Sequence, residues 1–439
     1  MSTSTPRLDL PGGTVVFVET SHALPLVSIT VSFRTGGAAD PNGKDGLGRM
    51  MGRLVRRGCD GLSMMQFERA VDTLGAELSV DVSSASLTFH AQVIRRNLGA
   101  FVALLGRMLH KPTFAQEEFD RLLREAVAEL EEARDSDRSL AQVAFRRDLF
   151  GLDHPYGRGS AGRISTLKSL RVDDVRGRYA RDARKSNLVL GFAGDISAEE
   201  AEKYALELSQ GLPDGGDDAP KVPEPERRSG RRVVFVDKPE RTQTQVVIGC
   251  LGTHPNDSDH HALLASAAVF GGTFTSRLMR EVRSKRGWSY GASARLGVER
   301  ARHALTIGTF PAATDAAACL ALELDLMQKW VEGGITPREL SFIKNYLVRS
   351  FAFEIDTPIK RLHQALDIEL LGLAPDYYAT HTDKTKEVTP ELANEAVKRR
   401  ISTEDLTIVV VGTAAQVAAD IEKAVPGLAS MDIVPFDRD

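Results

Sequence analysis

The sequence Gly46-Leu-Gly-Arg49-Met-Met-Gly52-Arg53-Leu54 has the pattern of a short amphipathic helix. Arg49 and Arg53 lie one turn apart, on the face opposite the apolar residues. Arg57-Gly58 would end the helix. From this stretch alone we expect an apolar stripe that is buried and a basic face that is solvated. Five apolar residues recur at the spacing of one helix face: Leu47, Met50, Met51, Leu54 and Val55.

The two arginines stand where an inverted zinc helix, with the pattern His-x-x-Glu-His, carries its two imidazoles. The glutamate base of that pattern would stand at Gly52. Arginine is always protonated and has no lone pair to give to a cation, and glycine has no basic side chain. The stretch therefore predicts a helix that repels a zinc ion.

The sequence before this helix resembles the opening of the insulinase family of zinc peptidases, which includes pitrilysin and the mitochondrial processing peptidase. The runs Leu8–Val18 and Pro25–Gly48 are similar to the family's strand pair, and Gly36-x-x-x-Asp40-Pro41 is similar to its Gly-x-x-x-Asp-Pro turn. The zinc helix follows this turn in the family. The resemblance covers essentially the whole chain, and it implies a family member whose zinc site has been deleted.

The chain contains an internal repeat on either side of a linker at residues 210–232, which is rich in Pro, Gly and charged residues. Val15-Val-Phe-Val recurs as Val233-Val-Phe-Val, and Asn187–Gly194 recurs as Asp405–Gly412, both at an interval of 218 residues (233 − 15 and 412 − 194). The sequence therefore predicts an N-terminal half-unit at 1–209 and a C-terminal half-unit at 233–439.

Each predicted half-unit alternates β-rich runs with amphipathic helices, which indicates an α+β fold with helices on one face of a mainly antiparallel sheet. The family resemblance agrees, since it implies a tandem of two such half-units in a processing-peptidase-like metallohydrolase fold. The predicted strands are 14–19, 26–34, 76–82, 85–92, 187–193, 232–237, 245–251, 288–296, 301–309 and 405–411. The predicted helices are 46–57, 64–74, 95–109, 115–134, 197–209, 260–270, 276–286, 312–331, 337–351 and 414–423.

The composition bounds the function classes. With 439 residues, two or more domains are expected. The 56 basic and 60 acidic residues give a net charge of −4, which argues against a general nucleic-acid binder. No apolar run has the length of a membrane span and the N-terminus lacks an apolar export signal, so we expect a cytoplasmic protein without a membrane partner. Three scattered cysteines predict small buried residues rather than a disulfide framework.

Glu129 is the position to which the resemblance assigns the third zinc ligand. One carboxylate without its two imidazoles does not hold a catalytic metal. The alternative is a glutamate on a helix face that pairs with Arg49 or Arg53, and we favour this interpretation. An ion pair would then replace the metal, and this chain would bind no cofactor.

Arg283 and Tyr290 form the second candidate site. A helix at 276–286 is followed by Gly287, which can adopt the left-handed conformation of a C-cap and reverse the chain. Arginine and tyrosine together can hold a peptide carbonyl and stabilise an oxyanion. The resemblance implies that this is the family's Arg/Tyr pair. The alternative is that Arg283 belongs to a solvated basic helix and that Tyr290 packs in a strand.

Two further motifs favour structure over chemistry. The stretch His254–His261 contains side chains that could bind a metal, but its Asp and Ser residues are also ordinary residues at a helix start. His154, in a His-Pro-Tyr-Gly stretch similar to one in the family, is interpreted as a turn residue. No phosphate-binding loop, dinucleotide motif or nucleophile elbow is found.

These features lead to one main hypothesis and two rivals. The main hypothesis is a zinc-free subunit of a heterodimeric metallopeptidase that is inactive alone, acts on peptides and has a homologous partner carrying zinc. The first rival is an inactive homodimeric scaffold or peptide-binding protein of the same fold. The second is an enzyme that uses another metal at 254–261.

Overall fold

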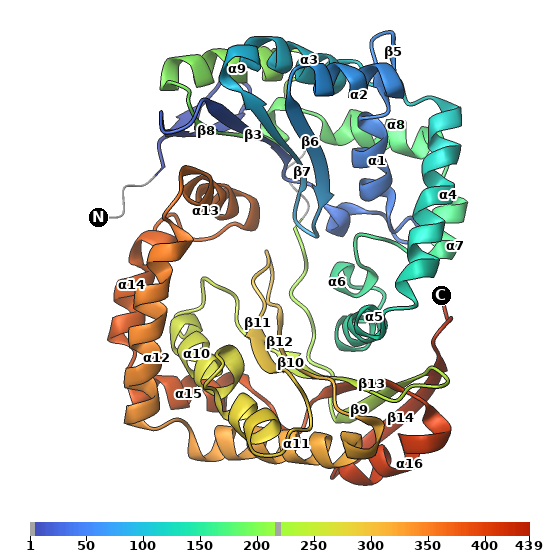
Figure 1. Cartoon of the computed structure of the whole chain (residues 1–439), viewed down its shortest axis with the longest axis vertical. Helices are drawn as coiled ribbons and strands as arrows, with labels where there is room; N and C mark the ends of the chain where they lie inside the picture. Colours follow the sequence, from blue (N-terminus) through green and yellow to red (C-terminus); the bar gives the residue numbers. More distant parts are fainter. Residues whose placement is uncertain (1–4, 216–220) are drawn as a thin grey trace. The chain divides into compact units, whose positions relative to one another are not determined.

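The computed structural model describes residues 5–215 and 221–439, which form two compact units (Figure 1). Unit 1 combines Met1–Leu130, Gly159–Val222 and Ala352–Ala379. Unit 2 combines Glu131–Arg158, Pro223–Phe351 and Thr380–Asp439. Each unit thus includes a segment from the other half of the sequence, in addition to the half-unit that the repeat predicts.

Unit 1 is built on a sheet with the strand order β1-β2-β8-β3-β7-β6. All neighbours are antiparallel except β2 and β8. Alternate residues of β2, such as Val16 and Val18, join one core with the apolar faces of the helices. The strands are β1 (Arg7–Asp9), β2 (Val15–Thr20), β3 (Leu26–Phe33), β6 (Ala76–Val82), β7 (Leu87–Ile94) and β8 (Leu188–Gly194), with a small hairpin of β4 (Gly58–Cys59) and β5 (Leu62–Ser63).

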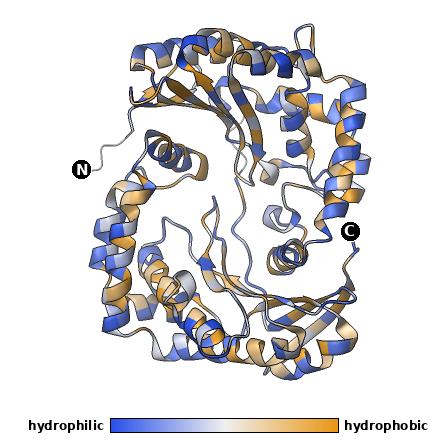
Figure 2. Ribbon diagram, in the orientation of Figure 1, coloured by the Kyte–Doolittle hydropathy of each residue, from blue (hydrophilic) through white to orange (hydrophobic). Residues whose placement is uncertain are grey.

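The helices of unit 1 carry one apolar face and one polar face, and Figure 2 shows them striped accordingly. In α1, Met50, Met51 and Leu54 are about 1% exposed, as the periodicity predicts. The helices are α1 (Leu47–Val55), α2 (Met64–Thr73), α3 (Leu98–His110), α4 (Gln116–Ala133), α7 (Ile164–Ser169), α8 (Val172–Asp182), α9 (Ala198–Gln210) and α13 (Pro358–Leu371).

Unit 2 repeats this plan with the strand order β11-β12-β10-β13-β9-β14, in which β9 is parallel to both neighbours. The strands are β9 (Arg231–Asp237), β10 (Gln245–Leu251), β11 (Ala292–Leu296), β12 (Ala304–Thr309), β13 (Thr407–Gly412) and β14 (Leu428–Pro435). The helices are α5 (Asp137–Phe150), α6 (Pro155–Arg158), α10 (His260–Ala267), α11 (Ala316–Gly333), α12 (Pro337–Ser350), α15 (Pro390–Arg400) and α16 (Ala414–Ala424), with α14 (Tyr377–Glu387) after α13 and two π-helical segments, η4 (Ala268–Gly272) and η5 (Met279–Ser284).

The exchanged segments cover the second face of each sheet. In unit 1, Leu362 of α13 packs where Gly191 leaves room in β8; a Cβ at Gly191 would lie 2.9 Å from Leu362 Cδ1. In unit 2, Phe145 of α5 packs against Gly249 of β10, where a Cβ would lie 2.6 Å from the ring. The α+β tandem is as predicted, but the helices are not restricted to one face of each sheet.

The Gly-x-x-x-Asp-Pro turn fixes the start of α1. The buried carboxylate of Asp40 accepts hydrogen bonds from the backbone N–H groups of Gly46 and Gly48, each at 2.9 Å, and from Arg178 at 2.8 Å. Burial raises the pKa of Asp40 to about 6, against the opposing effect of Arg178. The turn therefore places a negative charge at the N-terminus of α1, where the helix dipole favours it.

The expectation for the three cysteines is confirmed. Cys59, Cys250 and Cys319 are buried free thiols, as expected of small apolar residues. Across residues 5–215 and 221–439, no helix has both the length and the apolar character that a membrane crossing requires.

Candidate functional site

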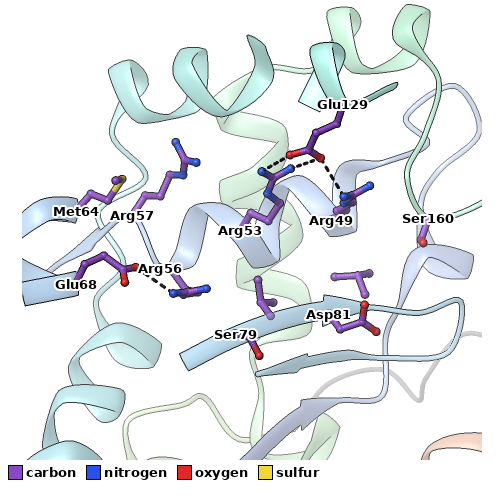
Figure 3. Close-up of a pocket in the computed structure, with 12 residues that line it drawn as sticks. Arg49, Arg53, Arg56, Arg57, Met64, Glu68, Ser79, Asp81, Glu129 and Ser160 are labelled. Atoms are coloured by element: carbon purple, nitrogen blue, oxygen red, sulfur yellow. Dashed lines mark hydrogen bonds and ion pairs between the residues drawn. The ribbon is translucent and has the colours of Figure 1, made fainter. Parts of the chain in front are cut away.

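The arginine face of α1 contacts the acidic face of α4 (Figure 3). Glu129 accepts hydrogen bonds from both terminal nitrogens of Arg53, at 2.7 and 2.9 Å, and from Arg49 at 3.0 Å. Just after the end of α1, Arg57 binds Glu125, and this contact lowers the pKa of Glu125. The ion pair expected between Glu129 and the two arginines is therefore present.

The residues at the former zinc positions do not fit a zinc ion. The guanidinium groups of Arg49 and Arg53 both donate to Glu129. Of these three residues, only Glu129 has a side chain that can bind zinc. Because guanidinium groups stay protonated and offer no lone pair, a cation between them would be repelled. Within the described part of the chain, no three His, Cys, Asp or Glu side chains converge in a way that could hold a metal ion.

Gly52 faces the sheet of unit 1. A Cβ at Gly52 would lie 2.8 Å from Leu87 Cδ1 and 3.2 Å from Val80 Cγ2, closer than carbon atoms normally approach. The backbone of α1 thus packs directly against β6 and β7. At the position where the zinc motif carries its glutamate, any side chain would therefore have to displace Leu87 or Val80.

A pocket of about 660 Å³ opens beside the arginine face of α1 (Figure 3). Arg56 contributes to its wall and pairs with Glu68 of α2 at 3.1 Å. The Nε atom of Arg56 is buried and, among the described residues, has no hydrogen-bond partner. Residues 79–82 of the edge strand β6 form the facing wall.

Arg283 and Tyr290 lie together in unit 2. The central guanidinium carbon of Arg283 is 4.5 Å from the ring centroid of Tyr290 and 4.6 Å from that of Phe274, within the range of cation–π contacts. Tyr290 is 77% exposed and Phe274 is 69% exposed. The arginine therefore contacts two solvent-accessible aromatic rings.

The charge partners of Arg283 differ from those of its neighbours. Arg277 pairs with Glu339 at 2.7 Å, and Arg286 pairs with Glu281 at 3.0 Å. Within residues 5–215 and 221–439, Arg283 has no carboxylate at ion-pair distance, so its donors are available to a ligand.

The local fold explains how the pair is brought together. Gly287 has φ +67°, and the N–H of Trp288 donates to the Val282 carbonyl at 3.1 Å, which reverses the chain after η5. The predicted reversal at Gly287 is present. The strand that follows begins at Ala292, not at 288, because residues 288–291 remain irregular. Tyr290 is therefore on a loop, and the alternative of strand packing is wrong for this side chain.

The His254–His261 stretch is structural. Asp259 binds Arg400 through two contacts at 2.7 and 2.9 Å. His260 shares a hydrogen bond with Thr253 at 2.9 Å, and burial lowers its pKa to about 3. The stretch begins α10, as the sequence suggested, and its acidic side chains are occupied by arginines.

His154 has the turn role assigned to it. Its Nδ1 accepts a hydrogen bond from the backbone N–H of Tyr156 at 3.1 Å, and its Nε2 lies 3.0 Å from the Pro223 carbonyl oxygen. Two other residues were not predicted. Phe274 follows Gly271-Gly272, and Arg56 is one of two consecutive arginines after α1, and neither position has a pattern that indicates a site.

Comparisons with known proteins identify a family for both halves of the chain. The model of the insulinase family, peptidase family M16, matches residues 15–154, and the model described as the peptidase M16 inactive domain matches residues 169–347. The non-peptidase homolog YmxG of Helicobacter pylori is 22% identical over 400 residues, which cover 90% of this chain and 91% of that protein.

Solved structures share the fold. The peptidase M16 inactive domain from Pseudomonas fluorescens aligns with a TM-score of 0.87 at 22% identity, covering 93% of this chain and 98% of that one. The periplasmic protease PqqL from Escherichia coli aligns with a TM-score of 0.78 at 16% identity, covering 98% of this chain but 51% of that one.

Fold and site together define a tandem of two α/β units that carries arginines in place of zinc ligands. The chain belongs to the insulinase family, peptidase M16.

Proposed function

We propose that the chain is the zinc-free subunit of a two-chain metallopeptidase. It would be inactive alone and would supply Arg283 and Tyr290 to hold the carbonyl of a peptide substrate. A homologous partner chain would carry the zinc site. The main support is the state of Arg283, which contacts Tyr290 but has no acidic partner among the described residues, although neighbouring arginines are paired.

The chemistry of peptide hydrolysis suits this pair. As water adds to a peptide carbonyl, negative charge develops on its oxygen. The guanidinium of Arg283 and the phenol of Tyr290 both donate hydrogen bonds, so together they can stabilise that charge. Zinc bound by the partner would supply the activation of water. Contact with two aromatic rings restricts the guanidinium before substrate arrives, which lowers the entropy lost on binding.

Pairing with a second chain is supported by the length of one relative. This chain aligns with only 51% of the PqqL protease chain, whose remaining half is long enough for a second tandem. The same pairing could be made by two separate chains. The cytoplasmic localisation expected from the sequence stays a prediction.

Reconstitution tests the proposal. We expect the purified chain to be zinc-free and unable to cleave peptides, and we expect cleavage to appear on mixing with a homologous chain that has the His-x-x-Glu-His motif. Arg283→Ala or Tyr290→Phe should then lower kcat by about tenfold or more, because each removes a donor to the oxyanion.

Arg280→Ala is the matched control for the reconstitution experiment. Arg280 lies on the same π-helical segment, its side chain is 54% exposed, and it forms an ion pair with Glu281 at 3.5 Å. Its loss should leave the rate unchanged. Full cleavage by both Arg283→Ala and Tyr290→Phe would contradict the role proposed for the pair.

A second candidate function is an inactive peptide-binding or scaffold protein that forms a homodimer. It is favoured by the ion pairs of Arg49 and Arg53 with Glu129, which replace the metal site, and by the description of the Helicobacter relative as a non-peptidase homolog. On this reading no zinc-motif partner restores cleavage, and the chain elutes as a self-paired dimer.

A further inference from the structure

We propose that Arg146 binds an acidic side chain of the peptide substrate, over a part of the unit 2 sheet that α5 leaves open. The inference rests on the proposed function in one respect, that the ligand is a peptide held by Arg283 and Tyr290. It adds a subsite that selects peptides with an acidic residue near the cleaved bond. We call the uncovered part the open sheet face and define it by Ser293 and Arg295 of β11 and Thr306 and Gly308 of β12.

The helix α5 covers only part of its sheet. It lies on the face opposite α11 (Figure 1), where Phe145 packs on Gly249 of β10. Val247 of β10 is 1% exposed, whereas Thr306 and Gly308 of the next strand, β12, are only partly buried. A Cβ at Gly308 would meet no atom within 4 Å. Because Gly308 pairs with Val247 and shares its face, the sheet beyond β10 is open to a ligand.

Arg146 lies on the flank of α5 that faces β12. It is about 100° around the helix from Phe145, which faces the sheet. Asp148 is about 60° to the other side of Phe145, and its ion pair at 3.0 Å is with an arginine of β9. Phe150, one turn after Arg146, contacts His303 just before β12, with ring centroids 5.2 Å apart. The side chain of Arg146 is therefore directed away from β9 and toward the open sheet face.

The guanidinium of Arg146 has no protein partner within residues 5–215 and 221–439. Its Nε atom is buried without a hydrogen bond. The two terminal nitrogens also lack a hydrogen bond or ion pair there, but they are not buried, so a ligand can reach them. Burial, and to a smaller extent the charge of Arg147, lowers the pKa of Arg146 to about 10. The group therefore stays charged at neutral pH.

A charge in this position is unfavourable for folding. A partly buried guanidinium loses hydration, and a neighbouring carboxylate normally offsets that loss. In the part of the chain that the structure describes, no carboxylate lies at ion-pair distance from Arg146, and the charge that acts on it is that of another arginine, Arg147. A residue that lowers stability without a compensating contact is typical of a binding site.

The surroundings favour a carboxylate as the ligand. None of the described residues that β10, β11 and β12 turn toward α5 is acidic. Arg295 is in register with Thr306 and Gly249, so it lies on this face and adds a second positive charge. It is exposed and forms no ion pair with the described residues. The terminal nitrogens of Arg146 can hold a carboxylate through two parallel hydrogen bonds.

The open sheet face begins close to Arg283 and Tyr290. Tyr290 precedes β11, which starts at Ala292, and Arg295 is three residues further along that strand. Three strand residues span about 10 Å. Arg146 follows the α5 residue that packs on the same row of the sheet as Arg295. An extended peptide held by the pair would therefore reach Arg146 with a side chain about three to five residues from the bound carbonyl.

Peptide binding to the full chain tests the inference. The probes are fluorescent extended peptides that carry one Glu, or one Gln in its place, and no other charged side chain. We expect the Glu peptide to bind about tenfold more tightly at low salt, with the difference shrinking as salt is added. Arg146→Ala should remove most of this difference. Arg146→Lys keeps a charge without the two-pronged geometry and should retain part of it.

Arg147→Ala is the matched control for the binding experiment. It removes the same kind of side chain from the next position of α5, on the flank that lines a separate pocket with residues of β9 and β14. We expect this variant to keep the full preference for the Glu peptide. Loss of the preference in Arg147→Ala as well would show that the general charge of α5, and not Arg146, is responsible.

Thermal denaturation separates a ligand-binding residue from a structural one. Arg146→Met keeps the apolar stem and removes the charge. We expect its melting temperature to equal or exceed that of the natural chain, because the partly buried charge has no carboxylate partner among the described residues. This variant therefore folds and still tests the peptide preference. A clearly lower melting temperature would show that Arg146 stabilises unit 2 and would overturn the inference.

The reconstituted peptidase gives a second readout. Mass spectrometry of the products should place the cleaved bond at a constant spacing from the Glu. Arg146→Met should lower kcat/KM for the Glu peptide by about tenfold, toward the value for the Gln peptide. Equal affinities of the natural chain for the two peptides, or an unchanged preference in Arg146→Met, would overturn the inference.

Failure of the proposed function gives a different pattern. In that case no cleavage appears on mixing, or Arg283→Ala leaves cleavage intact. The isolated chain would still prefer the Glu peptide, and Arg146→Ala would still remove that preference.

Discussion

Glu323 is a fully buried acid on α11 that contacts the Cys319 thiol at 3.7 Å. Its second carboxylate oxygen has no hydrogen-bond partner among the described residues. Burial raises the pKa of Glu323 from its usual 4.5 to about 7, since the low-dielectric core disfavours the charged form. The neutral acid is therefore the favoured form of Glu323 in the folded unit below about pH 7.

The stability of unit 2 should depend on pH through this residue. With the folded pKa above the unfolded one, the contribution of Glu323 is fully present below pH 4.5 and is lost as the pH rises through about 7. We expect Glu323→Gln to be more stable than the natural chain at pH 8, by about 3 kcal/mol, and similar to it at pH 4. Urea denaturation at both pH values measures this, and equal differences at both would contradict it.

The two arginines of α1 can be converted back into metal ligands. Replacing Arg49 and Arg53 by histidine would place two neutral imidazoles beside Glu129, the donor set of a zinc site. We expect the double variant to bind one zinc ion at neutral pH and to release it as the imidazoles protonate. Elemental analysis after dialysis measures this. Arg49→Gln with Arg53→Gln is the control, and an equal zinc content in both variants would contradict the prediction.

At the scale of elements, the contact of α1 with the sheet limits which side chains α1 can have on the face that contains Gly52. Adding a side chain at Gly52 forces it into Leu87 and Val80, and overpacking of this kind costs about 1 to 3 kcal/mol. We therefore expect Gly52→Glu to lower the free energy of unfolding by that amount. Gly177→Glu, on the exposed face of α8 with open space around its Cα, is the matched control.

A third variant makes the Gly52 test sharper. Leu87→Ala removes the atoms that the new side chain would meet, so combining it with Gly52→Glu should cost less than the sum of the two single changes. Strictly additive losses would show that Leu87 is not the obstacle.

The elements themselves were largely predictable. The apolar period of Leu47–Val55 located α1 within two residues at either end, and the left-handed Gly287 was read from its place after a helix. The start of β11 was not, because Trp288–Gly291 has strand composition but is held in a loop by the reversal before it. Local sequence does not contain that tertiary constraint.

Residues of the site were predictable from the sequence only where they occupy a recognisable motif position. Arg49 and Arg53 stand at a metal-ligand spacing, which made their meaning visible. Phe274 and Arg56 have no such signal, because an aromatic after two glycines and an arginine in a basic run are common. Their roles depend on contacts with Arg283 and Glu68, which lie nine and twelve residues away (283 − 274 and 68 − 56) and are not specified by the local pattern.

At the scale of the whole molecule, the internal repeat predicted two related units but not their composition. The segments Glu131–Arg158 and Ala352–Ala379 belong, by packing, to the unit of the other half. Their helices have ordinary amphipathic sequences. Amphipathicity indicates that one face of a helix is buried, but it does not indicate against which sheet.

This exchange makes a prediction for a nicked chain. A site-specific protease sequence placed at Asp214-Gly215 would cut between the halves of the sequence. We expect both fragments to co-elute in size-exclusion chromatography under native conditions and to separate only in denaturant, because Leu362 and Phe145 are each buried in the unit formed mainly by the other fragment. Separate elution without denaturant would contradict the assignment of the two segments.

The two exchanged segments are equal in length and lie 221 residues apart (352 − 131 and 379 − 158), close to the interval of the repeat. A polypeptide with only one repeat would thus have a sheet with one uncovered face and a helical segment with no sheet to pack against. Two copies could bury both surfaces by exchanging their helical segments, as domain-swapped dimers do. Fusing two such copies end to end would give the present connectivity without breaking any contact.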